Sequence, residues 1–358
     1  MLNRRSFIKQ VSALSLAAVL PPNAFSNTRQ NLGVALVGLG RYSTDILAPA
    51  LQQTKYCHLA GIVTGSPHKI PLWQEKYKIE DDNVYNYDNM YTIARNEAID
   101  VVYIVLPTGL HSQYSIIAAQ AGKHVWCEKP MAMTVRECEA MIKACRQNQV
   151  KLAIGYRMQH EPNTQTIIEY AKTKPYGNIK EVIAKAGYYD SRTDHWRQNK
   201  ALGGGAMYDM GVYPLNAARY TTGEEPTAVL SAQHSTSRPE IYHEVDETTV
   251  FTLAFPSGAV GRCKTSFEEN MNYLWANCER GWYELEPFQS YSGIKGKTSD
   301  GRLLNITIPN QQAKQMDDDA LSIISQRPMR VPGEEGLRDI RIVEAIYQSA
   351  AQRKQVQL

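Results

Sequence analysis

The sequence lacks the spacings by which short motifs usually hold metal ions. Its six cysteines include no C-x-x-C pair, and its eight histidines include no H-x-H or H-x-x-x-H pair. Zinc sites commonly draw on such pairs, so we predict no metal site. A chain of 358 residues can also build its core without disulfides, although an oxidising compartment would permit them.

Dense runs of basic or apolar residues are missing too. No cluster of lysine and arginine could follow a phosphate backbone, so we expect no nucleic-acid partner. The formal net charge of +3 includes Arg4, Arg5 and Lys9, and without them the rest of the chain is close to neutral. The apolar stretch at residues 11–20 is about half of the roughly twenty residues that a helix needs to span a bilayer. We therefore expect no membrane span in the mature protein.

A glycine-rich turn follows the first apolar strand, residues 33–37, and precedes a helix expected over residues 44–53. Two glycines let the backbone turn sharply and approach a pyrophosphate, which then binds the N–H groups at the start of the helix. Ser43 stands where the dinucleotide fingerprint usually has Gly or Ala, and it is small enough for close packing. The candidate cofactor contacts here are Gly38, Leu39, Gly40, Arg41 and Tyr42.

The end of the second strand, residues 59–63, indicates which nicotinamide cofactor is bound. NAD enzymes usually place Asp or Glu there to hold the ribose 2′-hydroxyl. This sequence continues Thr64-Gly65-Ser66-Pro67-His68-Lys69, with a lysine but no carboxylate to repel a 2′-phosphate. We therefore predict NADP, with NAD as the less favoured alternative, bound by Thr64, Gly65 and Lys69.

Two further apolar strands, residues 101–106 and 123–127, end at polar turns. Strands alternating with helices predict an α/β fold with a doubly wound parallel sheet. Ligands of such sheets bind beyond the carboxyl ends of the strands, so these turns should share one crevice with the glycine turn. The candidate cofactor contacts that they add are Leu106, Pro107, His111, Glu128 and Lys129.

The pattern changes in the second half of the chain. Residues 248–255 and 259–265 alternate apolar and polar side chains, which is typical of half-buried antiparallel strands. We therefore expect a Rossmann domain over residues 31–153 and an α+β domain with an open, mostly antiparallel sheet over residues 154–358. The final helix, about 335–352, should pack back on the first domain.

A helix is expected after the triple glycine at residues 203–205. Asp209 and Tyr213 lie four residues apart and would share one face of it, although Pro214 would have to be tolerated in mid-helix. Taken alone, the two side chains could equally be local hydrogen-bonding partners on a core helix. The aromatics Tyr188, Tyr189, Tyr273, Trp275 and Trp282 are interpreted as core residues, since aromatics in sheets usually are.

Over nearly all of residues 31–358 the chain resembles the Gfo/Idh/MocA oxidoreductase family, and within it the glucose–fructose oxidoreductase branch. The segments that carry the resemblance are 37–42 (VGLGRY), 127–132 (CEKPMA), 154–157 (IGYR), 196–197 (WR), 203–213 (GGGAMYDMGVY) and 332–336 (PGEEG). The resemblance implies a Rossmann domain followed by a substrate domain, and hydride transfer to or from a sugar carbon.

The resemblance also assigns residues to roles. It implies that Lys129, Asp209 and Tyr213 surround the reacting carbon, and that Thr64 and Lys69 meet the 2′-phosphate. It adds further cofactor contacts from Arg157, Trp196 and Arg197. Our choice for the proton-transfer residue is Tyr213, with Lys129 orienting the substrate, and the reverse assignment stays open.

Two departures from the family pattern matter. The glucose–fructose oxidoreductase branch has a long proline-rich arm that covers the cofactor, whereas only residues 27–31 separate the predicted signal from the first strand. The family often has Asn after the proline that ends the third strand, and here Thr108 takes that position. The shortened arm puts permanent retention of NADP in question.

Three enzymatic functions and one non-catalytic function follow. The favoured one uses tightly bound NADP to oxidise a glucose-like aldose to its lactone and reduce a fructose-like second sugar to an alditol, in a ping-pong cycle. The second is a simple NADP-dependent aldose dehydrogenase or reductase with exchangeable cofactor. The third is an exported NAD-dependent glycosidase. The fourth, a sugar or cofactor sensor, would not need acid–base groups.

Residues 1–26 have the pattern of a twin-arginine export signal. Arg4-Arg5 precedes the short apolar stretch, and Ala24-Phe25-Ser26 provides small residues for cleavage before Asn27. That route carries folded proteins, which suits an enzyme that must bind its cofactor first. We therefore expect the twin-arginine machinery as a partner and a periplasmic location; the alternative is a cytoplasmic protein with an incidental arginine pair. An open sheet would need a covering partner, so we also predict a homodimer or homotetramer.

Overall fold

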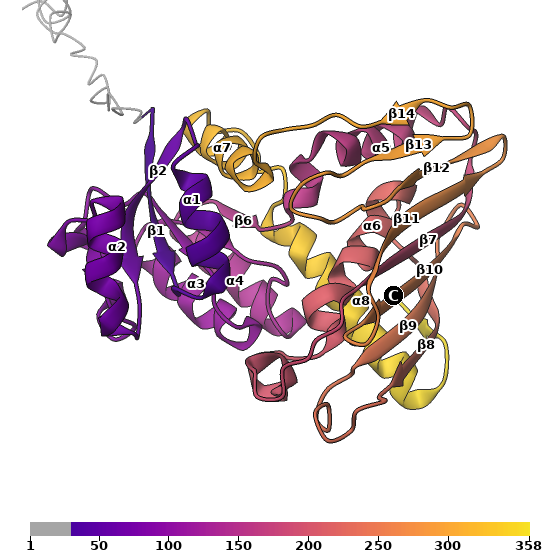
Figure 1. Cartoon of the computed structure of the whole chain (residues 1–358), viewed down its shortest axis with the longest axis horizontal. Helices are drawn as coiled ribbons and strands as arrows, with labels where there is room; N and C mark the ends of the chain where they lie inside the picture. The colour runs from indigo at the N-terminus through magenta and orange to yellow at the C-terminus, as the bar shows by residue number, and fades with distance from the viewer. Residues whose placement is uncertain (1–29) are drawn as a thin grey trace, which may run out of the picture. The chain divides into compact units, whose positions relative to one another are not determined.

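The apolar strands of the first half pair in parallel into one six-stranded sheet, in the order β3-β2-β1-β4-β5-β6 (Figure 1). The structure is a computed structural model that describes residues 30–358, so the predicted export signal lies outside the described residues. The strands are β1 (Leu32–Val37), β2 (Cys57–Val63), β3 (Val84–Tyr85), β4 (Val101–Ile104), β5 (His124–Cys127) and β6 (Leu152–Ile154).

Both faces of this sheet are buried, which explains why its strands are continuously apolar. Along β1, Val34 and Leu36 point into one core and Ala35 and Val37 into the other. The eight α-helices of the described residues are α1 (Ala48–Leu51), α2 (Ile70–Tyr77), α3 (His111–Gln120), α4 (Val135–Gln147), α5 (Pro162–Thr173), α6 (Val212–Thr222), α7 (Gln311–Ile324) and α8 (Gly333–Gln352).

The helix expected over residues 44–53 forms as a continuous helical stretch over residues 41–51, but part of it is not a regular α-helix. Ser43–Leu47 make a π-helical turn within it, and α1 is the four residues Ala48–Leu51 that follow this turn. The buried Ser43 hydroxyl donates a hydrogen bond to the carbonyl of Gly38 at 2.6 Å. Serine at this position therefore ties the first turn of the helix to the glycine turn.

The second half forms a nine-stranded sheet in the order β14-β13-β12-β11-β7-β10-β9-β8-β15. Only the β7–β10 pair is parallel. The strands are β7 (Ile179–Gly187), β8 (Ala228–Ser235), β9 (Thr248–Ala254), β10 (Val260–Ser266), β11 (Met271–Cys278), β12 (Gly281–Leu285), β13 (Gly296–Thr298), β14 (Leu303–Leu304) and β15 (Val356–Gln357). The predicted fold class, a Rossmann sheet followed by an α+β domain, is confirmed.

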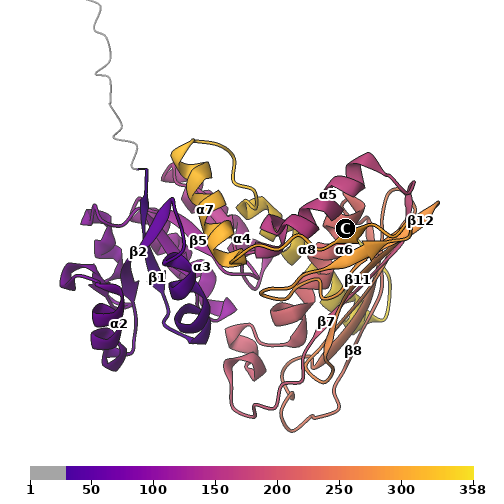
Figure 2. The same ribbon diagram turned by 45° about the horizontal axis from the view of Figure 1, so that its top comes forward.

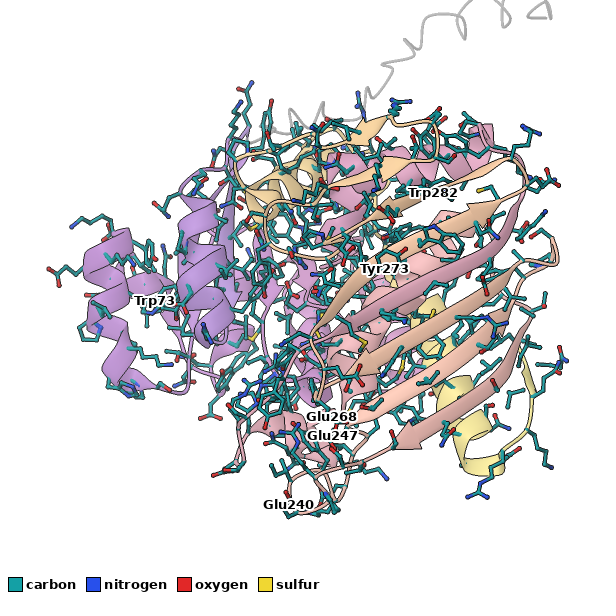
Figure 3. The ribbon with its side chains drawn as sticks, turned by 45° about the vertical axis from the view of Figure 1, so that its right-hand side comes forward. Trp73, Glu240, Glu247, Glu268, Tyr273 and Trp282 are labelled. Carbon is teal, nitrogen blue, oxygen red and sulfur yellow. The ribbon has the colours of Figure 1, made fainter. Side chains whose placement is uncertain are left out.

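The second sheet is covered on one face only. Helices α6 and α8 pack on it, with α5 behind α6 (Figure 2). Along its strands, the residues that face away from these helices are half-buried or exposed except at one end, where Thr248 and Ser266 are buried, and none of the described helices lies over them. Figure 3 shows this open face, with Tyr273 and Trp282 on it.

Two C-terminal helices join the halves. The predicted final helix corresponds to α8, which packs on α4 and β6 as well as on β8. The helix α7 was not expected on the first domain, yet its Ala313, Met316 and Ala320 belong to the core shared with β1 and α1. No helix among residues 30–358 combines the length and the apolar composition that crossing a membrane requires.

Candidate active site

The glycine turn leaves room for a phosphate. Gly38 has a φ of +94°, and a β-carbon there would lie 2.5 Å from the Val105 carbonyl oxygen, so only glycine fits. At Gly40 a β-carbon would meet no atom within 4 Å, and the residue is exposed. The turn therefore fits a pyrophosphate approaching the backbone N–H groups. The Arg41 side chain is 93% exposed and pairs with Asp45 at 3.3 Å.

The end of β2 lies beside this turn. The Lys69 amine donates a hydrogen bond to the carbonyl oxygen of Leu39 at 2.7 Å. The Thr64 hydroxyl accepts one from the Ser66 N–H at 3.0 Å. Gly65 lies against Tyr87, whose ring a β-carbon would approach to 2.9 Å. A hydroxyl and an amine thus lie at the end of β2, the position at which we predicted contacts to a 2′-phosphate.

His111 and Glu128 are buried where β4 and β5 end. The two ring nitrogens of His111 face the carbonyl oxygens of Pro130 and Leu106, each at 2.8 Å. His111 therefore ties the turn after β5 to the turn after β4. Glu128 accepts a hydrogen bond from the Tyr103 hydroxyl at 2.7 Å, and burial raises the pKa of its carboxyl group.

The three predicted catalytic residues come together. The Lys129 amine donates to the backbone carbonyl of Asp209 at 2.5 Å and lies 3.8 Å from the Asp209 carboxylate. The same amine lies 4.5 Å from the centre of the Tyr213 ring. Lys129 follows β5 of the first sheet, whereas the other two lie eighty or more positions later. The cluster therefore forms only when the two halves pack against each other.

The local helix geometry differs from the regular helix that we expected around Asp209. Asp209 lies in a π-helical turn, Met207–Gly211, and Tyr213 is the second residue of α6. Pro214 follows as the third residue of α6 and lies, as expected, within a continuous helical stretch over residues 206–222. Such π-turns are frequent at functional sites.

Asp209 is held ionised by its neighbours. Arg197 donates to its carboxylate at 2.7 Å, and the Tyr188 hydroxyl donates to the same oxygen at 3.1 Å. Burial alone would raise the pKa of Asp209, but the charges of Arg197 and Lys129 outweigh burial and hold it well below its usual range. The arrangement suits a carboxylate that orients donors rather than one that exchanges protons.

Arg157 connects to Tyr213. Its guanidinium is buried, with the residue only 2% exposed, and it donates to the Tyr213 hydroxyl at 2.8 Å and to the backbone carbonyl of Gln289. The structure therefore places Arg157 against the predicted proton-transfer residue. We had predicted it as a cofactor contact, and the two roles are compatible.

The triple glycine positions Arg197. A β-carbon at Gly203, which has a φ of +77°, would lie 2.6 Å from the Thr108 β-carbon, and one at Gly109 would lie 2.6 Å from the Ala201 carbonyl oxygen. Glycines thus let the segment at residues 196–205 press against the turn after β4. Arg197 stacks on the neighbouring Trp196 ring at 4.5 Å while it pairs with Asp209.

Comparisons with known proteins agree with this geometry. Residues 32–156 match the model of the oxidoreductase family with an NAD-binding Rossmann fold, GFO_IDH_MocA, and residues 164–284 match the GFO/IDH/MocA C-terminal domain. The chain is 38% identical to aldose-aldose oxidoreductase from Caulobacter crescentus, crystallised with glycerol. The match covers 92% of this chain and 100% of that one, with a TM-score of 0.88.

The chain belongs to the GFO/IDH/MocA oxidoreductase family. Among curated relatives, it is 27% identical to D-xylose 1-dehydrogenase [NADP(+)] from Haloarcula marismortui, over 90% of this chain and 92% of the relative. It is 25% identical to D-glucoside 3-dehydrogenase from Escherichia coli strain K12, over 92% of this chain and 99% of the relative. The predicted family and the prediction that the chain is an oxidoreductase are confirmed.

Two tyrosines at the site were missed by our sequence analysis. Tyr188, which we interpreted as core, reaches Asp209, and its position at the end of a substrate-domain strand was the available signal. Tyr291 lies over the Arg157 guanidinium at 4.7 Å in a loop with no distinguishing motif. Nothing in the local sequence around residue 291 indicates that this loop reaches the cluster of Lys129, Asp209 and Tyr213.

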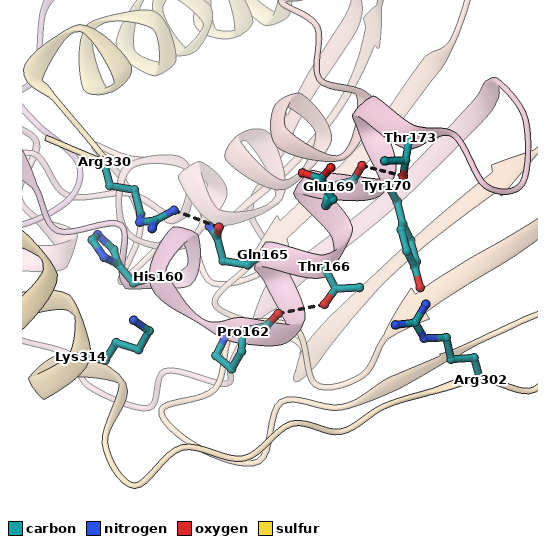
Figure 4. Close-up of a pocket in the computed structure, with 10 residues that line it drawn as sticks. All are labelled: His160, Pro162, Gln165, Thr166, Glu169, Tyr170, Thr173, Arg302, Lys314 and Arg330. Atoms are coloured by element: carbon teal, nitrogen blue, oxygen red, sulfur yellow. Dashed lines mark hydrogen bonds between the residues drawn. The ribbon is translucent and has the colours of Figure 1, made fainter. Parts of the chain in front are cut away.

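A separate groove of about 510 Å³ lies beside α5 (Figure 4). It is lined by His160, Pro162, Gln165, Thr166, Glu169, Tyr170, Thr173, Arg302, Lys314 and Arg330. None of these is a predicted site residue. The site of this oxidoreductase is therefore defined by its converging polar side chains and not by this groove.

Proposed function

We propose that this protein uses tightly held NADP to transfer a hydride from an aldose to a second sugar. The observation that carries the proposal is the meeting of Lys129, Asp209, Tyr213 and Arg157 beyond the carboxyl ends of a Rossmann sheet. The turn after β2, with Lys69 and no carboxylate, supports NADP. The named relatives, a D-xylose 1-dehydrogenase [NADP(+)] and an aldose-aldose oxidoreductase, support a sugar substrate.

The residues of the site fit each half of such a cycle. When bound, NADP would accept the hydride and later return it. In the first half, the C1–H bond of the aldose breaks with its electron pair, and the hydroxyl on C1 loses a proton, which leaves a lactone. Tyr213 is our choice to take that proton, and Lys129 would orient the oxygen. In the second half, the carbonyl carbon of the second sugar gains a hydride and its oxygen gains a proton, which gives an alditol.

The identity of the second sugar, which accepts the hydride, is the part of the proposed cycle that most needs a test. The sequence analysis favours a fructose-like acceptor, whereas the similarity to an aldose-aldose oxidoreductase supports a second aldose in that role. The similarity to D-xylose 1-dehydrogenase supports a second candidate function, in which the cofactor exchanges after each turnover.

The deciding experiment uses purified protein with no cofactor added. Glucose is added first, and the absorption band of reduced nicotinamide is recorded; fructose or xylose follows. A stoichiometric rise that stops and then falls with the second sugar would support the two-sugar cycle and show which acceptor works. Continuous turnover only after NADP is supplied would support the simple dehydrogenase instead.

Location and assembly are also proposals. We propose export to the periplasm through the twin-arginine machinery, which a fractionation of cells carrying the native or an Arg4→Lys, Arg5→Lys signal would test. We further propose that the open sheet face is covered by a second copy of the chain, as a dimer or tetramer. Val250 is 46% exposed on β9 and Leu230 is 37% exposed on the neighbouring β8. A monomer by light scattering would contradict the assembly.

A further inference from the structure

Tyr291 is a large aromatic residue that stays half-exposed beside the site. It lies in the segment between β12 and β13, and 51% of the residue is exposed. Its ring lies over the Arg157 guanidinium at 4.7 Å, within the range of a cation–π contact. Arg157 in turn holds the Tyr213 hydroxyl. The exposed ring is therefore one contact away from the predicted proton-transfer residue.

The segment that presents Tyr291 is fixed in place. The side chain of Asn272, on β11, accepts hydrogen bonds from the N–H groups of Phe288 and Gln289 at 2.8 and 3.0 Å. Its amide group also donates to the Ser290 hydroxyl at 3.1 Å. Arg157 binds the Gln289 carbonyl from the other side. Several hydrogen bonds thus position a residue that stays half-exposed beside the site.

The ring of Tyr291 meets a residue of the glycine turn. Its centre lies 5.8 Å from the centre of the Tyr42 ring, a normal separation for an aromatic pair. Tyr42 follows directly on Gly38-Leu39-Gly40-Arg41, where a pyrophosphate would bind. The contact therefore connects the two halves of the molecule from the predicted phosphate site to the predicted reaction site.

We propose that Tyr42 and Tyr291 form an aromatic clasp that restricts the release of the dinucleotide between the two half-reactions. The inference rests on the proposed function, because only a cycle with resident NADP needs such retention. The contacts that hold Tyr291 in place are its ring pair with Tyr42 and its cation–π contact with Arg157.

The test compares release of NADP from the whole protein and from Tyr291→Ala. Each protein is loaded with NADPH, and the loss of its absorption band is followed while a second enzyme consumes whatever is released. We expect release from Tyr291→Ala to be about 10-fold faster, because the aromatic pair and the cation–π contact are both lost. Tyr291→Phe keeps the ring and should stay within about 2-fold of the native protein.

Two further variants test whether any change in release is specific to the Tyr291 ring and its segment. Tyr91→Ala removes another exposed tyrosine, 66% exposed and remote in sequence from the clasp, and should leave release unchanged. Asn272→Ala loosens the segment without touching the ring and should speed release in the same direction. Equal release rates for Tyr291→Ala and the native protein would overturn the clasp, as would a Tyr291→Phe variant that behaves like Tyr291→Ala.

The outcome also separates the clasp from the proposed function. If the native protein releases NADPH within one turnover, the two-sugar cycle fails. The ratio of the two release rates still decides whether the clasp exists. If the native protein retains NADPH and Tyr291→Ala retains it equally well, the cycle stands and the clasp fails.

Discussion

The two walls of the site are built in different ways. On the cofactor side, several predicted groups come directly after a parallel strand, as Gly38 does after β1, Thr64 after β2 and Glu128-Lys129 after β5. On the sugar side, Arg157 follows β6 of the same sheet, but Tyr188 follows β7 of the second sheet, Asp209 lies in a π-turn and Tyr291 in an irregular segment. The ends of parallel strands place the cofactor-side groups through local structure. The sugar-side groups, in contrast, meet only because the two halves of the molecule pack together.

Removing Lys129 should have the largest effect on kcat/KM, because its amine contacts both Asp209 and the Tyr213 ring. We expect Lys129→Ala to lower kcat/KM by about 10²- to 10⁴-fold, the usual contribution of a positioned acid–base group. Bound NADP per protein should stay within about 2-fold of native if the glycine turn carries the binding. Steady-state kinetics and cofactor content check the two walls separately. Lys172→Ala, a 70% exposed lysine, is the control.

Arg157→Ala should disturb the sugar side most and, through the Tyr291 contact, should also loosen the proposed clasp. The buried guanidinium positions both the Tyr213 hydroxyl and the segment at Gln289, so we expect kcat to fall about 10²-fold, the effect of a small misplacement of reacting groups. Arg157→Lys keeps the charge but cannot reach both partners, and should recover little activity. Recovery of native kcat by the lysine variant would contradict a positioning role.

Lys69→Ala should affect only the cofactor side. The amine lies beside the glycine turn, on the Leu39 carbonyl, where a 2′-phosphate would find it. We expect the preference for NADP over NAD to fall by about 10- to 100-fold, the value of one charge-assisted hydrogen bond. Titration of each variant with both cofactors measures this. A variant that binds NADP as tightly as the native protein would remove Lys69 from the site.

Asp209→Asn should lower the free energy of unfolding, by an amount that depends on pH. The pKa of Asp209 is held below its value in the unfolded chain, so its ionised form stabilises the native state at pH values above about 4. That stabilisation is lost as the pH falls toward the lowered pKa. We expect Asp209→Asn to cost about 1.5–3 kcal/mol of unfolding free energy at neutral pH.

The difference in unfolding free energy between Asp209→Asn and the native protein should then become smaller below about pH 4. Chemical unfolding at several pH values measures it. A gap that stays constant down to low pH would show that the charge of Asp209 contributes nothing, and that the two pairs with Arg197 and Lys129 are not what stabilises it.

The elements of the first half were predictable because their signals are local. The strand before Gly38, the turn after β2 and the strand before Lys129 each follow from a short apolar run and the residues that end it. The start of the first helix was not predictable, because the π-turn at Ser43–Leu47 depends on how Ser43 packs on the glycine turn. The same reason applies to Asp209 and the π-turn before Pro214.

The sequence by itself determined the chemistry available to this protein: a dinucleotide turn, a phosphate-tolerant strand end, a lysine, a carboxylate and a phenol. Only the tertiary structure decided which of these side chains meet. Lys129 contacts Asp209 because two sheets pack together, and Tyr291 reaches Arg157 and Tyr42 because Asn272 fixes its segment. Contacts between residues that are distant in the chain depend on packing, and packing leaves no local motif to find.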